Sequence, residues 1–161
     1  MNTHPADLLD LAISRTGSPI CVGLDPVLDQ LPEACRAARA DVDAIEFFSR
    51  GVLDAVAPVA PAVKVQSACF ERFGSRGFAS MERTIAHARS LGMVVVLDAK
   101  RGDIGISASH YAASAAAMGA HFVTVNGYLG PSGVAPFLDA GLGAFVLVRT
   151  SNPDSDHVQS L

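Results

Sequence analysis

The sequence has little of what marks several large classes of protein. Its three cysteines, Cys21, Cys35 and Cys69, are odd in number and lack the spacing of metal or redox sites, so we expect the reduced thiols of a cytoplasmic protein. No apolar run reaches the length that spans a membrane, and the amino terminus lacks the apolar core of a signal peptide. A net charge of −4 provides no clustered basic excess for nucleic acid. We therefore expect neither a membrane nor a nucleic acid as partner.

Motifs for cofactors are absent too. The turn after the first apolar segment, Leu24-Asp25-Pro26, lacks the G-x-G-x-x-G pattern of dinucleotide-binding folds, and no Walker sequence occurs anywhere. The five histidines lack the spacing of metal ligands. The sequence therefore predicts neither a metal site nor a Rossmann-type nucleotide cofactor.

What is present is the composition of a globular protein. Of the 161 residues, 50% are hydrophobic and 17% are charged, which suits one domain, residues 1–161, with a sizeable core. Short apolar segments predict strands at 20–25, 62–68, 93–97, 121–126 and 144–149. Apolar residues at helical spacing predict helices at 5–16, 41–56, 78–92, 107–118 and 134–140.

The alternation of strands and helices is typical of an α/β fold. A doubly wound sheet and a (β/α)8 barrel both produce this alternation, and the missing dinucleotide motif favours the barrel. A barrel of this type typically needs about 250 residues. We therefore predict an α/β fold of the (β/α)8 TIM-barrel type, of which about the first five βα units are present.

A group of charged residues follows the third predicted strand. Met93 to Leu97 is an apolar run typical of a strand buried on both faces, and Asp98, Lys100, Arg101 and Asp103 come directly after it. Because such folds bind ligands at the carboxyl ends of their strands, these charges indicate a site. Asp98 and Lys100 are two positions apart and would form an ion pair on one side of an extended segment. The alternative is a surface ion pair in a polar loop, with Asp103 as the N-cap of the next helix.

Lys64 lies among apolar residues within the second predicted strand. Lysine is almost never fully buried without a partner, so we expect a carboxylate in the same site, and Asp98 is the natural candidate. In the alternative, Lys64 lies at a strand edge and extends its ammonium group to solvent.

The segment from Asp98 to Gly105 reads Asp-x-Lys-x-x-Asp-Ile-Gly and resembles the signature of the orotidine 5'-phosphate decarboxylases. The similarity is greatest to the bacterial branch with Lys-Arg-Gly-Asp-Ile-Gly in this loop. It extends from Cys21-Val-Gly-Leu-Asp25-Pro26 to Arg149-Thr-Ser-Asn-Pro153, over about the first two-thirds of the family's length. We therefore expect a chain truncated at its C-terminus, without the family's phosphate-holding loops and with little activity on its own.

The resemblance implies an activity and a catalytic array. The family converts orotidine 5'-phosphate to uridine 5'-phosphate (UMP) and carbon dioxide without a metal or organic cofactor. Its array of lysines and aspartates corresponds to Lys64, Asp98, Lys100 and Asp103. Asp98 would lie beside the substrate carboxylate, Lys100 would protonate the carbanion at C6, and Lys64 would orient Asp98 and the ribose. Asp103 would come from the partner chain of a homodimer, so that each site needs two chains.

The resemblance also implies substrate-binding residues. Asp25 would accept hydrogen bonds from ribose hydroxyls, and Ser151 would hydrogen-bond the pyrimidine ring. Ile104 would form an apolar wall near the leaving carbon dioxide. Ser107 stands where the family usually has threonine, which keeps the hydroxyl group.

Two other kinds of enzyme and a non-enzyme are the alternatives. Magnesium-dependent sugar-phosphate lyases or synthases of the same barrel group share Asp-x-Lys-x-x-Asp, but they place a glutamate suited to magnesium where this chain has Lys64. A Schiff-base aldolase could use Lys100. A non-catalytic fragment would only associate with full-length subunits, through the face that carries Asp103.

Overall fold

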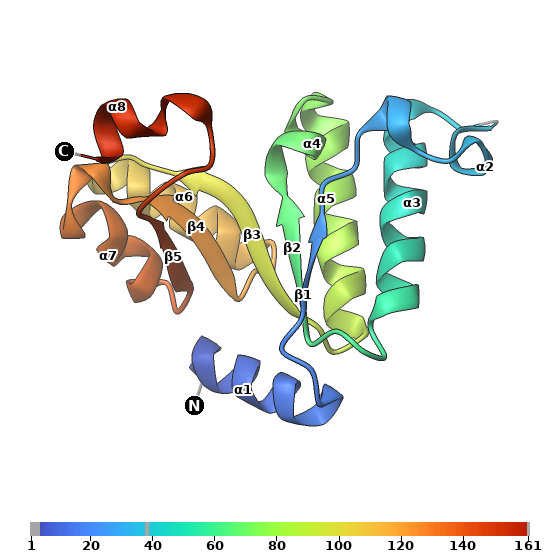
Figure 1. The fold of residues 1–161 in the computed structure, drawn as a ribbon, viewed down its shortest axis with the longest axis horizontal. Helices are drawn as coiled ribbons and strands as arrows, with labels where there is room; N and C mark the ends of the chain where they lie inside the picture. Colours follow the sequence, from blue (N-terminus) through green and yellow to red (C-terminus); the bar gives the residue numbers. More distant parts are fainter. Residues whose placement is uncertain (1–3, 38, 161) are drawn as a thin grey trace.

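The computed structural model describes residues 4–37 and 39–160, and at its centre is a five-stranded parallel sheet (Figure 1). The strands pair in sequence order, each with the next. They are β1 (Cys21–Leu24), β2 (Ala62–Gln66), β3 (Val94–Arg101), β4 (Phe122–Asn126) and β5 (Gly143–Leu147).

Helices connect the strands, which confirms the predicted α/β class. They are α1 (Pro5–Thr16), α2 (Glu33–Arg36), α3 (Asp41–Val56), α4 (Ser67–Glu71), α5 (Gly74–Ser90), α6 (Gly105–Ala117), α7 (Pro131–Asp139) and α8 (Asp156–Gln159), with 3-10 turns at η1 (Leu28–Gln30), η2 (Gly127–Leu129) and η3 (Pro153–Ser155). Within the described ranges, no helix has both the length and the apolar composition that crossing a membrane requires.

Two strand boundaries differ from the predicted ones in ways that matter for the site. β2 ends at Gln66 rather than at residue 68, because α4 begins at Ser67. β3 continues to Arg101 instead of ending at Leu97. Asp98, Lys100 and Arg101 are therefore held in the sheet itself, whereas Asp103 lies in the loop that follows it.

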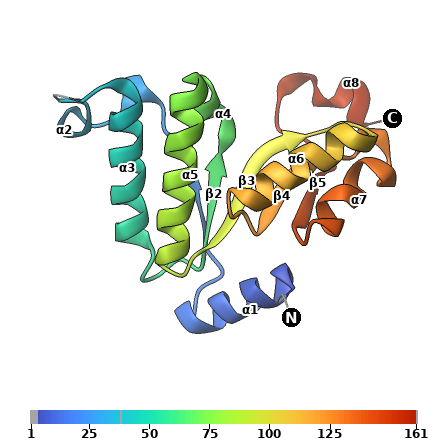
Figure 2. The same ribbon diagram turned by 180° about the vertical axis from the view of Figure 1, so that it is seen from behind.

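Helices α3, α5, α6 and α7 lie along one face of the sheet, as Figures 1 and 2 show from opposite sides. On this outer face, alternate strand positions carry valine or leucine, and these side chains are buried against the helices. The strand residues are Val63, Val65, Val95, Leu97, Val123 and Val125, and the helix residues include Ile45, Leu53, Met81, Ile85 and Phe137. Burial of each such side chain stabilises the fold by roughly 1.5–3 kcal/mol. This core fixes the strand register, and with it the positions of side chains on the opposite face.

The opposite face, called the inner face below, has an apolar and a polar part. Toward the amino ends of the strands, Ala62, Val94, Val96 and Phe122 are buried together with Ala12 of α1. Figure 1 shows α1 crossing this end of the sheet. Because strand side chains alternate between faces, the same face continues toward the carboxyl ends with the polar residues described in the next subsection.

β1 and β5 are the edge strands of the sheet, since each pairs with a single neighbour among the described residues. Phe145 and Val146 of β5 are 47% and 44% exposed. A curved parallel sheet with helices on its outer face is the arrangement expected for part of a (β/α)8 barrel, in which the inner face is enclosed.

Two helical glycines differ in how closely other atoms approach them, which allows the packing of α5 against α4 to be tested. An added Cβ at Gly77 of α5 would lie 1.9 Å from the backbone oxygen of Phe70, whereas at Gly51 of α3 it would meet nothing within 4 Å. We expect Gly77→Ala to lower the free energy of unfolding by about 1–3 kcal/mol through overpacking. Gly51→Ala should raise it by about 0.5–1 kcal/mol, because alanine is the better helix former. Urea unfolding of both variants measures these changes, and shifts of the same sign would contradict the packing described here.

Candidate active site

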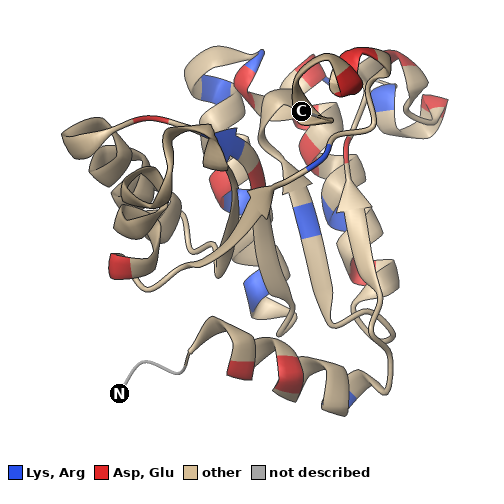
Figure 3. Cartoon of the chain, turned by 60° about the vertical axis from the view of Figure 1, so that its left-hand side comes forward, with Lys and Arg blue, Asp and Glu red and all other residues tan. Residues whose placement is uncertain are grey.

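Polar side chains gather toward the carboxyl ends of the strands on the inner face. Figure 3 shows that most charged residues lie on helices and loops and that the strands are largely uncharged. The exceptions are Lys64 on β2 and the last residues of β3. Asp98 of β3 lies at the centre of the cluster and accepts hydrogen bonds from Lys64, Gln66, Lys100 and Thr124. Three neighbouring strands thus supply one site.

Each oxygen of the Asp98 carboxylate accepts two hydrogen bonds. Oδ1 accepts from Lys100 Nζ and from Thr124 Oγ1, both at 2.7 Å. Oδ2 accepts from Lys64 Nζ and from Gln66 Nε2, both at 3.0 Å. The side chain of Asp98 is only 6% exposed, and four donors fill the acceptor capacity of a carboxylate. A buried charge needs paired and hydrogen-bonded surroundings, and this one has both.

These contacts keep Asp98 ionised. Burial by itself raises the pKa of the carboxyl group, because leaving water disfavours the charged form. Hydrogen bonds from Lys100, Thr124 and Lys64, with the positive charge of Lys64, outweigh burial and lower the pKa from 3.8 to about 2. At neutral pH the site therefore holds a buried anion between two ammonium groups.

Lys64 connects Asp98 to a second carboxylate. Its Nζ lies 3.0 Å from Asp98 Oδ2 and 3.2 Å from Oδ1 of Asp25, which directly follows β1. Burial lowers the pKa of Lys64, but the hydrogen bonds and charges of the two carboxylates outweigh it, so the pKa is raised. The predicted contact between Lys64 and Asp98 is confirmed. The alternative of a lysine that extends to solvent is wrong, because two carboxylates hold the ammonium group.

Lys100 has an unusual backbone conformation. Its φ of 44° makes it the one non-glycine residue with a positive φ in the part of the chain that the structure describes. Such a conformation costs about 1–3 kcal/mol. It accompanies a shift in strand register, since Leu97 pairs with Val123 but Arg101 pairs with Val125. Three residues of β3 thus face one residue of β4. The Lys100 side chain is 47% exposed and so remains accessible to a ligand.

The predicted ion pair between Asp98 and Lys100 is therefore present, but not as a surface pair. Asp98 is buried, so the alternative of an exposed pair in a polar loop is wrong. Asp103 is not the N-cap of α6 either. Ile104 holds that position, and its N–H donates to Asp103 Oδ1 at 2.8 Å.

Arg101 turns away from the carboxylate of Asp98. Its guanidinium group forms an ion pair with Glu71 of α4 and lies 5.1 Å from the ring centre of Tyr111 in α6. Of the four charged residues that follow Leu97 in the sequence, two thus belong to the cluster. Arg101 instead ties the end of β3 to the helices on either side.

The remaining predicted site residues do not join the hydrogen bonds of the cluster. Asp103 and Ser107 are half-buried before and within the first turn of α6, and Ile104 is 63% exposed. Ser151 is exposed in the loop after β5. Among the described residues, no hydrogen bond links Asp103, Ser107 or Ser151 to Asp98 or to either lysine. Their functional roles stay predictions.

Two members of the cluster were not predicted from the sequence. Gln66 and Thr124 each donate a hydrogen bond to Asp98, yet neither belongs to the charged motif. The available signal was that each is a polar residue in a mostly apolar strand, at a position two residues or fewer from the strand's carboxyl end.

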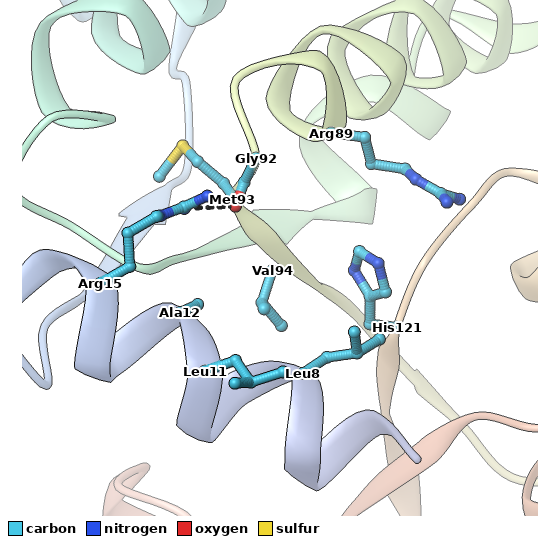
Figure 4. A pocket seen from close by; sticks show the side chains of 9 residues that line it. All are labelled: Leu8, Leu11, Ala12, Arg15, Arg89, Gly92, Met93, Val94 and His121. Carbon is cyan, nitrogen blue, oxygen red and sulfur yellow. Dashed lines mark hydrogen bonds between the residues drawn. The ribbon is translucent and has the colours of Figure 1, made fainter. Parts of the chain in front are cut away.

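A cavity of about 290 Å³ lies at the opposite end of the sheet (Figure 4). Its lining includes Arg15 of α1, Arg89 at the end of α5 and His121 just before β4. Arg15 donates to the carbonyl oxygen of Gly92 at 2.6 Å, and Arg89 donates to that of Gly119 at 3.2 Å. Both guanidinium groups therefore satisfy carbonyls that follow helices, and the predicted site residues are not among those that line this cavity.

The chain matches the model of the Orotidine 5'-phosphate decarboxylase / HUMPS family over residues 18–161. It belongs to this family. The orotidine 5'-phosphate decarboxylases of Rhodopirellula baltica and Streptomyces coelicolor are 40% and 45% identical over 97% and 88% of this chain. The structure of Leishmania donovani OMP decarboxylase superposes with a TM-score of 0.83 at 34% identity, over 99% of this chain and 59% of that one.

Family membership confirms the resemblance and the barrel-type fold predicted from the sequence. The match with the Orotidine 5'-phosphate decarboxylase / HUMPS family includes every residue of the polar cluster. The chain spans 58% and 53% of the length of its Rhodopirellula and Streptomyces relatives. It therefore holds a little more than half of the structure that these relatives possess.

The lowered pKa of Asp98 makes the free energy of unfolding depend on pH. Because the folded-state pKa of about 2 lies below the unfolded value of 3.8, the carboxylate stabilises the fold above about pH 4 and loses this effect as the pH falls toward 2. The contribution is roughly 2 kcal/mol, of which about half should be lost by pH 3. Unfolding free energies of the wild type and Asp98→Asn, measured by urea between pH 7 and pH 3, should converge by about 1 kcal/mol. A constant difference would contradict the assignment.

Proposed function

We propose that the protein to which this chain belongs is an orotidine 5'-phosphate decarboxylase, a cytoplasmic carboxy-lyase of UMP biosynthesis. The observation that carries the proposal is the Asp98 carboxylate, buried and held ionised next to the accessible ammonium group of Lys100. A fixed anion beside a cation suits a reaction in which a carboxylate is lost as carbon dioxide and a carbanion appears. The names of the relatives support the same activity.

In the proposed reaction the bond between C6 of the pyrimidine and its carboxylate breaks, and carbon dioxide departs. The electron pair stays on C6, where Lys100 Nζ would stabilise it electrostatically and then donate a proton. Asp98 would face the substrate carboxylate. Repulsion between the two negative charges raises the free energy of the ground state more than that of the transition state, in which the substrate carboxylate is losing its charge. The hydrogen bonds from Lys64 and Thr124 support this role, because they prevent the side chain of Asp98 from turning away from the substrate.

The remaining assignments concern binding of the substrate. Asp25, which Lys64 holds at 3.2 Å, would accept hydrogen bonds from the ribose hydroxyls. Ile104 would form an apolar wall near the departing carbon dioxide, and its 63% exposure leaves it free to contact a ligand. Ser107 and Ser151 would bind the substrate from α6 and from the loop after β5. We propose that no metal or organic cofactor takes part.

The magnesium-dependent sugar-phosphate alternative is not favoured by the cluster. Lys64 brings an ammonium group to the place where a magnesium ligand would be needed, and it would repel a divalent cation. All four acceptor positions of Asp98 are already occupied. Within residues 4–37 and 39–160, no group of three His, Cys, Asp or Glu side chains is placed to hold a metal ion.

The activity can be tested with two proteins. One is the 161-residue chain, and the other is a hybrid in which residues 1–161 are joined to the C-terminal part of the Streptomyces coelicolor relative. Loss of the orotidine absorbance on conversion to UMP would be measured for both, with the complete relative as positive control. A folded hybrid without turnover would overturn the proposal, whereas an inactive chain beside an active hybrid would support a site that needs the rest of the barrel.

Removal of the proposed proton donor gives a sharper test. We expect Lys100→Ala in the hybrid to lower kcat by about 10²–10⁴-fold, the usual effect of a lost catalytic acid. Arg83→Ala is the matched control, because it removes a cation whose partner Glu46 lies on the outer helices. Circular dichroism would verify that both variants are folded. A Lys100→Ala variant that keeps more than a few per cent of the activity would remove Lys100 from this role.

We further propose a homodimer in which Asp103 serves the site of the partner chain. Among the described residues, Asp103 Oδ1 accepts a hydrogen bond from the neighbouring Ile104 N–H, and its second oxygen accepts none and is available to a group of another chain. Mixing Asp103→Ala hybrid with Lys100→Ala hybrid should restore some turnover, because a mixed dimer rebuilds one complete site. Subunit exchange would be verified by native mass spectrometry. Continued inactivity despite exchange would mean that Asp103 acts within its own chain.

A further inference from the structure

Thr124 occupies a position between the two groups that the proposed chemistry needs. Its Oγ1 donates to Asp98 Oδ1 at 2.7 Å and accepts from the backbone N–H of Lys100 at 2.9 Å. The side chain is 9% exposed and comes from β4, the strand next to the one that carries both partners. One hydroxyl group thus joins the carboxylate of Asp98 to the backbone of Lys100.

We propose that Thr124 is a positioning residue that holds Asp98 and Lys100 in their reactive arrangement. The inference concerns the geometry of the cluster, and it rests on the proposed function only for its effect on turnover. The hydroxyl group of Thr124 is engaged by Asp98 and by the backbone of Lys100, and among the described residues it makes no hydrogen bond to the ammonium group of Lys100. It acts through the backbone of one residue and the side chain of the other.

The direction of the two hydrogen bonds is fixed by chemistry. A hydroxyl group has one proton to donate and can accept through its lone pairs. The backbone N–H of Lys100 can only donate, so the oxygen of Thr124 must accept from it. An ionised carboxylate can only accept, so the single hydroxyl proton must go to Asp98. Valine has the same shape and can make neither bond, whereas serine can make both.

The strand register explains why a side chain is needed here. In a regular parallel ladder, backbone carbonyls of β4 would accept from alternate N–H groups of β3. The register shift between Leu97 and Arg101 leaves three β3 residues opposite Thr124. At Lys100 the N–H donates to the hydroxyl oxygen of Thr124, a side-chain acceptor. Lys100 is the residue with φ of 44°, where the chain departs most from a strand.

A purely structural role would be that of any buried threonine, and the chain offers one for comparison. Thr84 of α5 is fully buried, and its Oγ1 donates to the carbonyl oxygen of Ser80 at 2.8 Å. Like Thr124, it loses a buried hydrogen bond when replaced by valine. Its helix lies on the outer face, away from the polar cluster. Thr84→Val is therefore the matched control.

The first test uses the 161-residue chain and needs no turnover. In Thr124→Val, amide hydrogen exchange at Lys100 should accelerate by at least about five-fold, the effect of one lost hydrogen bond. The Asp98 carboxyl carbon, followed by NMR against pH, should titrate about half a unit to one unit higher. Thr124→Ser should behave as the wild type in both measurements. Thr84→Val should leave both unchanged at Lys100 and Asp98.

The second test measures decarboxylation in the hybrid. Thr124→Val should lower kcat by about 10- to 100-fold, as expected when reacting groups are misplaced. KM should change little, because the hydroxyl group of Thr124 is already engaged by Asp98 and the backbone of Lys100. Thr124→Ser should recover most of the loss. If Thr124→Val does not fold, Thr124→Ala removes the same hydroxyl group with less bulk.

Unchanged exchange at Lys100 and unchanged titration of Asp98 in folded Thr124→Val would overturn the inference. So would a serine variant as impaired as the valine variant, since the methyl group and not the hydroxyl would then be responsible. The inference and the proposed function fail separately. If Thr124→Val changes both the amide exchange of Lys100 and the titration of Asp98, but no hybrid turns over substrate, the positioning role is supported and the decarboxylase assignment is overturned.

Discussion

The buried carboxylate of Asp98 is the interaction on which the rest of the site depends. Taking such an ion out of water costs several kcal/mol unless its partners are already in place. Here the partners come from β2, β3 and β4, so the charge is satisfied only when three strands pair in one register. A slip of one residue would turn every side chain of a strand to the other face. The carboxylate therefore favours the register that the outer core also requires.

The two faces of the sheet differ in polarity at the carboxyl ends of the strands, which explains how an apolar strand can carry a lysine. Val63 and Val65 of β2 are fully buried on the outer face, and Lys64 between them points to the inner face. The apolar neighbours fix the strand, so the ammonium group needs no loop to hold it. A site built on strands keeps its side chains in fixed positions, which suits groups that must meet a reacting atom within a fraction of an ångström.

The parts of the site that could be predicted from the sequence depend on local pattern. A lysine in an apolar strand needs a carboxylate, and Asp98 was the partner at the end of the next strand. Gln66 and Thr124 escaped prediction because their contacts depend on how strands pair, and threonine is an ordinary strand residue. The ion pair of Asp98 and Lys100 was expected from a regular strand, yet it forms at a bulge with a positive φ. The roles proposed for Asp103 and Ser151 concern a partner chain and a ligand, which the local pattern of one chain does not specify.

The chain has far more arginine than lysine, and this contrast suggests a reason for the two lysines in the cluster. Lys64 and Lys100 are the only lysines, so ten of the twelve basic residues are arginine. Arginine serves where a charge pairs with a carboxylate between two helices or binds a carbonyl that follows a helix, as Arg83 and Arg15 do. A guanidinium group does not give up its proton in proteins, whereas an ammonium group is compact and can transfer one. Arginine at position 100 would preserve the charge but not the proposed proton transfer, and its planar fork would meet only Oδ1 of Asp98, which also accepts from Thr124.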